Sequence, residues 1–156
     1  MPSDCRETSG DASITFALNG ETDMATIHIE RVIEASADFV WDRLRDFGAL
    51  HTRVAPGFIL DTLVEGDVRT VTFDGGLVMR ERLIAIDDDH RRIVYSILAD
   101  LFEHHSASNT VVPEGEDRCR FVWVVDFLPA EPKARIEGMM NAGADAIKAA
   151  MEKAAG

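Results

Sequence analysis

The sequence has few cysteines and no long apolar run. Only two cysteines occur in 156 residues, Cys5 in a polar N-terminal segment and Cys119 in a strand-like run. Neither a disulfide framework nor a cysteine-based metal site is therefore supported. No apolar stretch reaches the roughly 18 residues of a membrane-spanning helix, and the N-terminus lacks the basic start and apolar core of a signal peptide. We expect a cytoplasmic protein with no segment inserted in a membrane.

Positive charge is also scarce. Sixteen Lys and Arg residues stand against 28 Asp and Glu residues, which gives a formal net charge of -12 at pH 7. No basic cluster interrupts this acidic background, so a phosphate backbone or an anionic membrane surface would be repelled. We expect no nucleic-acid partner.

The short motifs of several catalytic classes are absent too. The sequence contains no P-loop, GxGxxG, HExxH or GxSxG pattern. We expect neither a metal ion nor a cofactor.

The length and the balance of residue types predict one globular domain. The chain is 46% apolar and 28% charged, enough for one sizeable core. Residues 1–22 are rich in Ser, Asp, Thr and Gly, which predicts a flexible lead-in before a single domain over residues 23–156. Within the lead-in, "ITFAL" is long enough for a short edge strand.

The hydrophobic pattern changes period along the chain. Alternation in "ATIHIERVIEA" from Ala25 predicts a strand. Ser36 then fits the N-cap of a short helix that ends by Gly48, and "ALHTRVAPG" predicts a second helical turn. Six strand-like runs follow, joined by short links rich in Gly and Asp, which predicts an antiparallel meander. These runs cover residues 58–66, 68–76, 77–87, 92–100, 104–112 and 118–128.

The C-terminal segment predicts a long amphipathic helix over residues 133–156. Its apolar side chains recur at spacings of three and four; they are Ile136, Met139, Met140, Gly143, Ala144, Ile147 and Met151. Such a helix buries its stripe against the concave face of the sheet. We therefore predict an α+β fold with a seven-stranded antiparallel sheet wrapped around this helix. Two arrangements remain open. The helix either packs closely on the sheet, or it stands off the sheet so that its small residues leave a cavity and its methionines adapt to the molecule that fills it.

The order of elements and three motifs resemble the START-related, Bet v 1-like superfamily of polyketide cyclase/dehydratase-like (SRPBCC) proteins. The motifs are "IEASADFVWDRLRDFGAL", "GDVRTVTFDGGLVMRERLIAIDDDHRRIVYSI" and "RFVWVVDFLP", and the resemblance covers about residues 25–153. It implies the helix-grip fold and an elongated apolar cavity between the sheet and the last helix. It leaves the function open, since the superfamily includes ligand carriers, receptors, cyclases, dehydratases and lyases. The segment "HTRVAPG" departs from the pattern, because many relatives have a tryptophan before this proline.

The run "EHHSASNT" contains adjacent histidines on a predicted strand. Successive side chains of a strand point to opposite faces, so His104 and His105 cannot share a metal ion without a bulge. The Ser and Thr row suits the outer face, which leaves His105 and Asn109 facing inward. The resemblance implies the same, because this position often holds a cavity-lining tyrosine. His105 then has three alternative roles: an interior histidine with satisfied hydrogen bonds, a ligand contact, or a general base.

A second polar pair is expected on two neighbouring strands. Glu81 lies in an otherwise apolar row with Leu77, Met79, Leu83 and Ala85, so an inward Glu81 needs a partner or a raised pKa. Arg69 on the preceding strand is the natural partner, because a guanidinium can hold a carboxylate at two points. The pair could either stabilise the sheet or belong to a binding or catalytic site. Tyr95 is either a core aromatic or a ligand contact, and Trp123 has apolar residues on both faces of its strand, so its direction stays open.

These residues define two hypotheses for function. In the first, the protein binds a small hydrophobic molecule, aromatic or polycyclic, between the sheet and the last helix. In the second, it is a cofactor-independent cyclase, dehydratase or isomerase in which His105 or Glu81 moves a proton beside a carbonyl. The predicted ligand-binding residues are Arg69, Met79, Tyr95, Asn109, Trp123, Met140, Gly143, Ala144 and Ile147. We expect a monomer or a homodimer.

Overall fold

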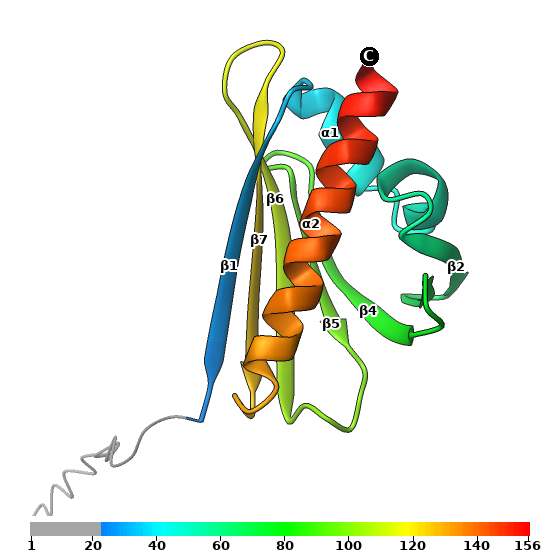
Figure 1. Cartoon of the computed structure of the whole chain (residues 1–156), viewed down its shortest axis with the longest axis vertical. Coiled ribbons are helices and arrows are strands. Elements are labelled where there is room, and N and C mark those ends of the chain that lie inside the picture. Colours follow the sequence, from blue (N-terminus) through cyan, green and yellow to red (C-terminus); the bar gives the residue numbers. More distant parts are fainter. Residues whose placement is uncertain (1–22) are drawn as a thin grey trace, which may run out of the picture.

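A seven-stranded antiparallel sheet forms most of the molecule, and a long C-terminal helix crosses its concave face (Figure 1). The computed structural model describes residues 23–156, so the predicted lead-in and "ITFAL" lie outside the described residues. The helices are α1 (Ala37–Leu44), the short π-helical turn η1 (Leu50–Val54) and α2 (Lys133–Ala155). The strands are β1 (Ala25–Ile33), β2 (Ile59–Glu65), β3 (Val68–Phe73), β4 (Val78–Asp87), β5 (Arg92–Ile97), β6 (His104–Pro113) and β7 (Cys119–Leu128).

The strand order is β1-β7-β6-β5-β4-β3-β2. Strands β2 to β7 therefore form the predicted meander, and β1 closes onto β7 at one edge. The short links allow only antiparallel neighbours, because a parallel crossover needs about a dozen residues or more. The predicted α+β helix-grip architecture, with two short helical segments after the first strand, is confirmed.

Helix α1 begins where its capping residue predicts. The Ser36 Oγ accepts a hydrogen bond from the Phe39 backbone N–H at 3.2 Å, which satisfies one of the free donors of the first turn. At the other end, α1 is tied to the β4–β5 turn. The Trp41 Nε1 donates to Asp88 at 2.9 Å, and the Arg45 Nε donates to the same carboxylate at 2.7 Å. The acidic turn therefore anchors α1 to the sheet.

The inward and outward rows of β6 are as predicted. His105, Ala107, Asn109 and Val111 are buried, and the Ser and Thr side chains between them are half-buried on the opposite face. The predicted row of β4 is wrong in one place. A register irregularity between Leu83 and Ala85 places one extra residue in the strand, so Ala85 is exposed and Ile86 packs against the core instead. A bulge of this kind reverses the alternation beyond it.

Helix α2 buries most of the predicted stripe and leaves Ile136 and Met139 half-buried. Its backbone approaches mainly β1 and η1. Polar contacts reinforce the contact with β1: the Arg31 Nε donates to Asp145 at 2.7 Å, and the Lys148 Nζ donates to the Val32 carbonyl at 2.6 Å. Within residues 23–156, no helix is long and apolar enough to span a bilayer.

Candidate functional site

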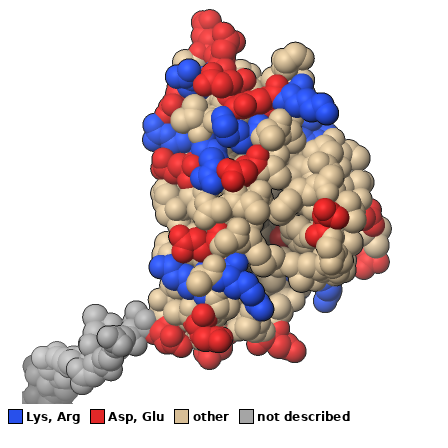
Figure 2. Space-filling model, viewed as in Figure 1, with Lys and Arg blue, Asp and Glu red and all other residues tan. Residues whose placement is uncertain are grey.

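A cavity of about 480 Å³ lies between α2 and the concave face of the sheet. In Figure 2 a hollow opens beside the surface over α2, bordered mostly by uncharged side chains. The helix leans on β1 and η1 and stays away from the middle of the sheet. This geometry corresponds to the second of the two predicted arrangements, a helix held off the sheet.

The wall of the cavity is mostly apolar. Its aromatic members come from five separate segments and are Phe58, Phe73, Tyr95, Phe102 and Trp123. Its aliphatic and sulfur-containing members include Leu44, Leu50, Val54, Ile59, Met79, Ile93, Ile97, Leu98, Leu101, Val125, Ile136, Met139, Met140 and Ile147. A pocket of this size and lining suits a small hydrophobic ligand.

The predicted residues of α2 do not all face the cavity. Met140, Gly143 and Ile147 line it, whereas Ala144 is fully buried and is not part of the lining. Gly143 is small because Trp123 lies against it: a Cβ at this position would be 3.3 Å from the Trp123 ring. The indole therefore points inward and spans the gap between sheet and helix, which resolves the direction that the apolar pattern of β7 left open.

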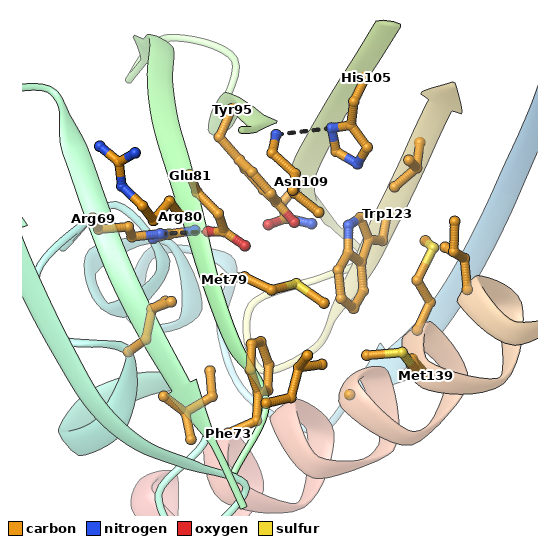
Figure 3. Close-up of a pocket in the computed structure, with 18 of the residues that line it drawn as sticks. Arg69, Phe73, Met79, Arg80, Glu81, Tyr95, His105, Asn109, Trp123 and Met139 are labelled. Atoms are coloured by element: carbon orange, nitrogen blue, oxygen red, sulfur yellow. Dashed lines mark hydrogen bonds and ion pairs between the residues drawn. The ribbon is translucent and has the colours of Figure 1, made fainter. Parts of the chain in front are cut away.

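Arg69 and Glu81 form a buried ion pair on the sheet wall. They are direct neighbours across β3 and β4, and the Arg69 Nε donates to the Glu81 Oε2 at 2.6 Å (Figure 3). Their exposures are only 4% and 5%. The guanidinium also donates to the Phe47 carbonyl at 3.2 Å and lies 5.1 Å from the centre of the Tyr95 ring. The predicted partnership is confirmed, and each charge is compensated where water cannot reach it easily.

Tyr95 lies beside this pair. Burial raises the pKa of its hydroxyl, and the Glu81 carboxylate raises it further, while Arg69 and Trp123 lower it in part. The hydroxyl therefore stays protonated at neutral pH. The Trp123 indole N–H lies near it without the geometry of a hydrogen bond.

His105 faces the cavity, and a backbone N–H sets the tautomer of its ring. Its Nδ1 accepts a hydrogen bond from the Ile97 N–H at 3.0 Å (Figure 3), and its ring lies 4.9 Å from the ring of Phe102. Burial, and then the neighbouring His104, lower the pKa of His105 to about 4. The neutral ring therefore has its proton on Nε2, and the cavity-facing edge is a hydrogen-bond donor. This geometry favours the ligand-contact alternative over the general base.

Asn109 and Trp123 are direct neighbours across β6 and β7. Asn109 is 7% exposed. Among residues 23–156, the Asn109 Nδ2 and the Trp123 Nε1 are buried without a hydrogen-bond partner. Buried donors are nearly always paired in proteins, so two neighbouring exceptions on a cavity wall are informative.

His104 and His105 do not converge, since His104 is exposed on the other face of β6. Within the part of the chain that the structure describes, no group of three His, Cys, Asp or Glu side chains is placed to hold a metal ion. Cys119 is a buried free thiol, and burial raises its pKa to about 11, with Glu114 adding to the effect.

Several lining residues were not predicted. Phe58 follows the Pro-Gly break after η1, and Phe102 lies in the β5–β6 connection, whose lower polarity was the one available signal. Phe73 occupies an inward position of β3, next to a glycine turn. These aromatics come from segments that look like ordinary loops and strand ends, so their convergence required the fold.

The comparison with protein families gives a match over nearly the whole domain. A family model described as "Polyketide cyclase / dehydrase and lipid transport" matches residues 24–155. No curated protein matches the chain. The family match confirms the resemblance to the START-related, Bet v 1-like superfamily.

Solved structures with the same fold include proteins of different kinds. An uncharacterized protein from Bacillus thuringiensis superimposes with a TM-score of 0.73 at 22% identity, over 81% of this chain and 98% of that chain. A point mutant of norcoclaurine synthase from Thalictrum flavum, in complex with a transition-state analogue, gives 0.67 at 26% identity, over 86% and 98%. The di-domain ARO/CYC protein BexL gives 0.70 at 14% identity, over 82% of this chain and 46% of that chain.

Proposed function

The chain belongs to the polyketide cyclase/dehydrase and lipid transport family, and we propose that it binds a small aromatic or polycyclic molecule in the cavity between the sheet and α2. Family membership and the helix-grip fold together support a ligand-binding or cyclase role. The identity of the ligand class is our inference from the cavity. A cytoplasmic location, the oligomeric state and the absence of a cofactor stay predictions.

The observation that carries this proposal is the cavity of about 480 Å³ with an apolar wall. Burying apolar surface of a ligand contributes about 25 cal/mol per Å², which supplies affinity. The five aromatic side chains of the wall suit flat ring systems, because aromatic pairs add stacking or edge-to-face contacts. The few polar groups, Arg69 with Glu81, Tyr95, His105 and Asn109, would orient the ligand.

The test uses the fluorescent apolar probe N-phenyl-1-naphthylamine. The wild-type protein is expected to bind it with a rise in probe fluorescence. Met139→Trp places an indole at a half-buried position of the wall and is expected to weaken binding by about tenfold or more by filling space. Ala149→Trp, at an exposed position of the same helix, is the matched control and should leave binding unchanged. Equal affinity of all three proteins would contradict the proposal.

A second function, cofactor-independent catalysis, has its own supporting observation. The Glu81 carboxylate lies in the cavity wall next to the protonated Tyr95 hydroxyl. In such an arrangement Glu81 would move a proton and Tyr95 would donate a hydrogen bond to a carbonyl. Norcoclaurine synthase, 26% identical over 80% of this chain, has been solved with dopamine and hydroxybenzaldehyde, so this pair is a reasonable first probe of activity.

Glu81→Gln separates catalysis from binding. On the catalytic alternative, this variant should lower turnover of an accepted substrate by about a hundredfold or more while changing affinity little. On the binding function alone, no product forms with either protein. Product formation that is unaffected by Glu81→Gln would remove Glu81 from the catalytic role.

A further inference from the structure

The polar groups of the cavity wall are mainly hydrogen-bond donors that lack acceptors. The Asn109 Nδ2 and the Trp123 Nε1 have no partner among residues 23–156. The Tyr95 hydroxyl stays protonated because burial raises its pKa. The His105 Nε2 has its proton because Nδ1 already accepts from the Ile97 N–H.

Two acceptors of the wall, the Glu81 Oε2 and the His105 Nδ1, are already engaged. The Glu81 carboxylate receives the Arg69 guanidinium at 2.6 Å, which also neutralises its charge. The His105 Nδ1 is occupied by the backbone. Two buried donors of the wall, the Asn109 Nδ2 and the Trp123 Nε1, still have no acceptor among residues 23–156, and the Trp123 indole nitrogen can only donate.

The donors occupy two places along the inner face of the sheet. Asn109 pairs with Trp123 across β6 and β7, and Tyr95 lies on the neighbouring strand, opposite Ala107. His105 is four residues from Asn109 on the same strand, a distance of roughly 13 Å along β6 at about 3.3 Å per residue. In Figure 3 Asn109, Tyr95 and Trp123 lie together, with His105 beyond them.

We infer, on the basis of the proposed function, that the cavity selects apolar ligands that present acceptor oxygens, such as ketones and quinones, over hydrocarbons of the same shape. A carbonyl oxygen gives the buried donors the partner they lack. A hydrocarbon leaves them unpaired.

The test compares two ligands of nearly identical shape, 9-fluorenone and fluorene, in competition with N-phenyl-1-naphthylamine. The measured quantity is the ratio of their affinities, so general differences in hydrophobicity cancel between protein variants. Asn109→Leu and Trp123→Phe each remove an unpaired donor and keep an apolar side chain. Each is expected to lower the fluorenone-to-fluorene ratio by about tenfold, the value of one hydrogen bond to a buried donor. Thr110→Val, on the outer face of β6, is the control and should keep the wild-type ratio.

A second readout needs no ligand. Replacing an unpaired buried donor with an apolar group is neutral or stabilising, so Asn109→Leu should leave the melting temperature of the unliganded protein unchanged or raise it. A marked fall would show that Asn109 serves folding and would overturn the inference. A ratio that both variants leave unchanged would overturn it as well, while the proposed function would stand. If neither compound displaces the probe from the wild-type protein, both proposals fail.

Discussion

The two halves of α2 meet the sheet in different ways. In the C-terminal half, Ala144 and Met151 are 0% exposed, and Lys148 binds the Val32 carbonyl of β1. In the N-terminal half, Ile136 and Met139 are half-buried and line the cavity. We call Ala144, Lys148 and Met151 of α2, together with β1, the packed end, and we call the whole cavity wall, which includes Ile136 and Met139 of α2, the cavity end. Ile147 borders the cavity as well.

The difference shows how one amphipathic helix can serve two purposes. Both halves present small or flexible side chains on the same face. At the packed end the backbone comes close to β1, and these side chains fill a core. At the cavity end the helix is held off the sheet, so similar side chains border open space. The packed end should therefore determine stability, and the cavity end should tolerate changes that alter its volume.

The cavity end should not tolerate changes to its buried ion pair. Breaking this pair should lower the free energy of unfolding more than any other change proposed below. Glu81→Leu leaves the Arg69 guanidinium buried without its carboxylate, which should lower the free energy of unfolding by about 3–5 kcal/mol. Urea denaturation measures this. The double variant Arg69→Met/Glu81→Leu should recover most of the loss, because an apolar pair replaces the charges. A double variant as unstable as the single one would contradict the explanation.

Methionines at the two ends offer a direct comparison. Met151→Ala should lower the free energy of unfolding by about 2–5 kcal/mol, because it opens a void in a closed core. Met139→Ala should lower it by less than about 1 kcal/mol, since Met139 already borders space and makes fewer contacts. Thermal and urea unfolding of both variants check the order. Similar losses at the two positions would mean that the cavity end is packed like the core.

His105 predicts a pH dependence that originates at the cavity end. Its pKa in the folded protein, about 4, lies below the ordinary value of about 6.5. The unfolded chain therefore takes up a proton first as the pH falls. The neutral ring makes its full contribution to the free energy of unfolding above about pH 6.5. As the pH falls from about 6.5 toward 4 this contribution is lost, and at pH 5 the loss is about 2 kcal/mol.

The measurement is the difference in unfolding free energy between pH 7 and pH 5. His105→Phe removes this titration and should reduce the difference by that amount, while the other histidines contribute equally to both proteins. An unchanged difference would show that His105 titrates normally in the folded state.

Gly143 marks the boundary between the two ends and predicts the smallest effect. An alanine Cβ would lie 3.3 Å from the Trp123 ring, which is tight, but the ring borders the cavity and has room to shift. The gain in helix propensity, up to about 1 kcal/mol, should then make Gly143→Ala neutral or stabilising. A loss of stability, with unchanged Trp123 fluorescence, would mean that the indole is held rigidly.

Much of this architecture follows from patterns that the sequence displays. The change of period at Ser36, the glycine turns and the stripe of α2 predicted the elements and their order. Alternation along β6 placed His105 and Asn109 inward, and the lone carboxylate in an apolar row predicted that Glu81 needs Arg69. In each case a local pattern has one physical solution.

Other features depend on the whole fold. The extra residue in β4 near Leu83 leaves no trace in the local pattern, and Trp123 has apolar neighbours on both faces of its strand. Ala144 and Gly143 are adjacent on the stripe, yet only Gly143 lines the cavity, because the rotation of α2 about its axis decides which side of the stripe faces the cavity. The His105 Nε2 is a hydrogen-bond donor because the Nδ1 accepts from the Ile97 N–H of the neighbouring strand, a contact that only the fold establishes.

We expect the cavity end to bind apolar ligands while the packed end stays closed. Titration of isotope-labelled protein with 9-fluorenone, followed by amide chemical shifts, tests it directly. We predict saturable shifts at Tyr95, Asn109 and Met139 and none at Ile33 and Met151. Shifts spread over the outer surface, or no saturable shifts at the cavity end, would contradict it.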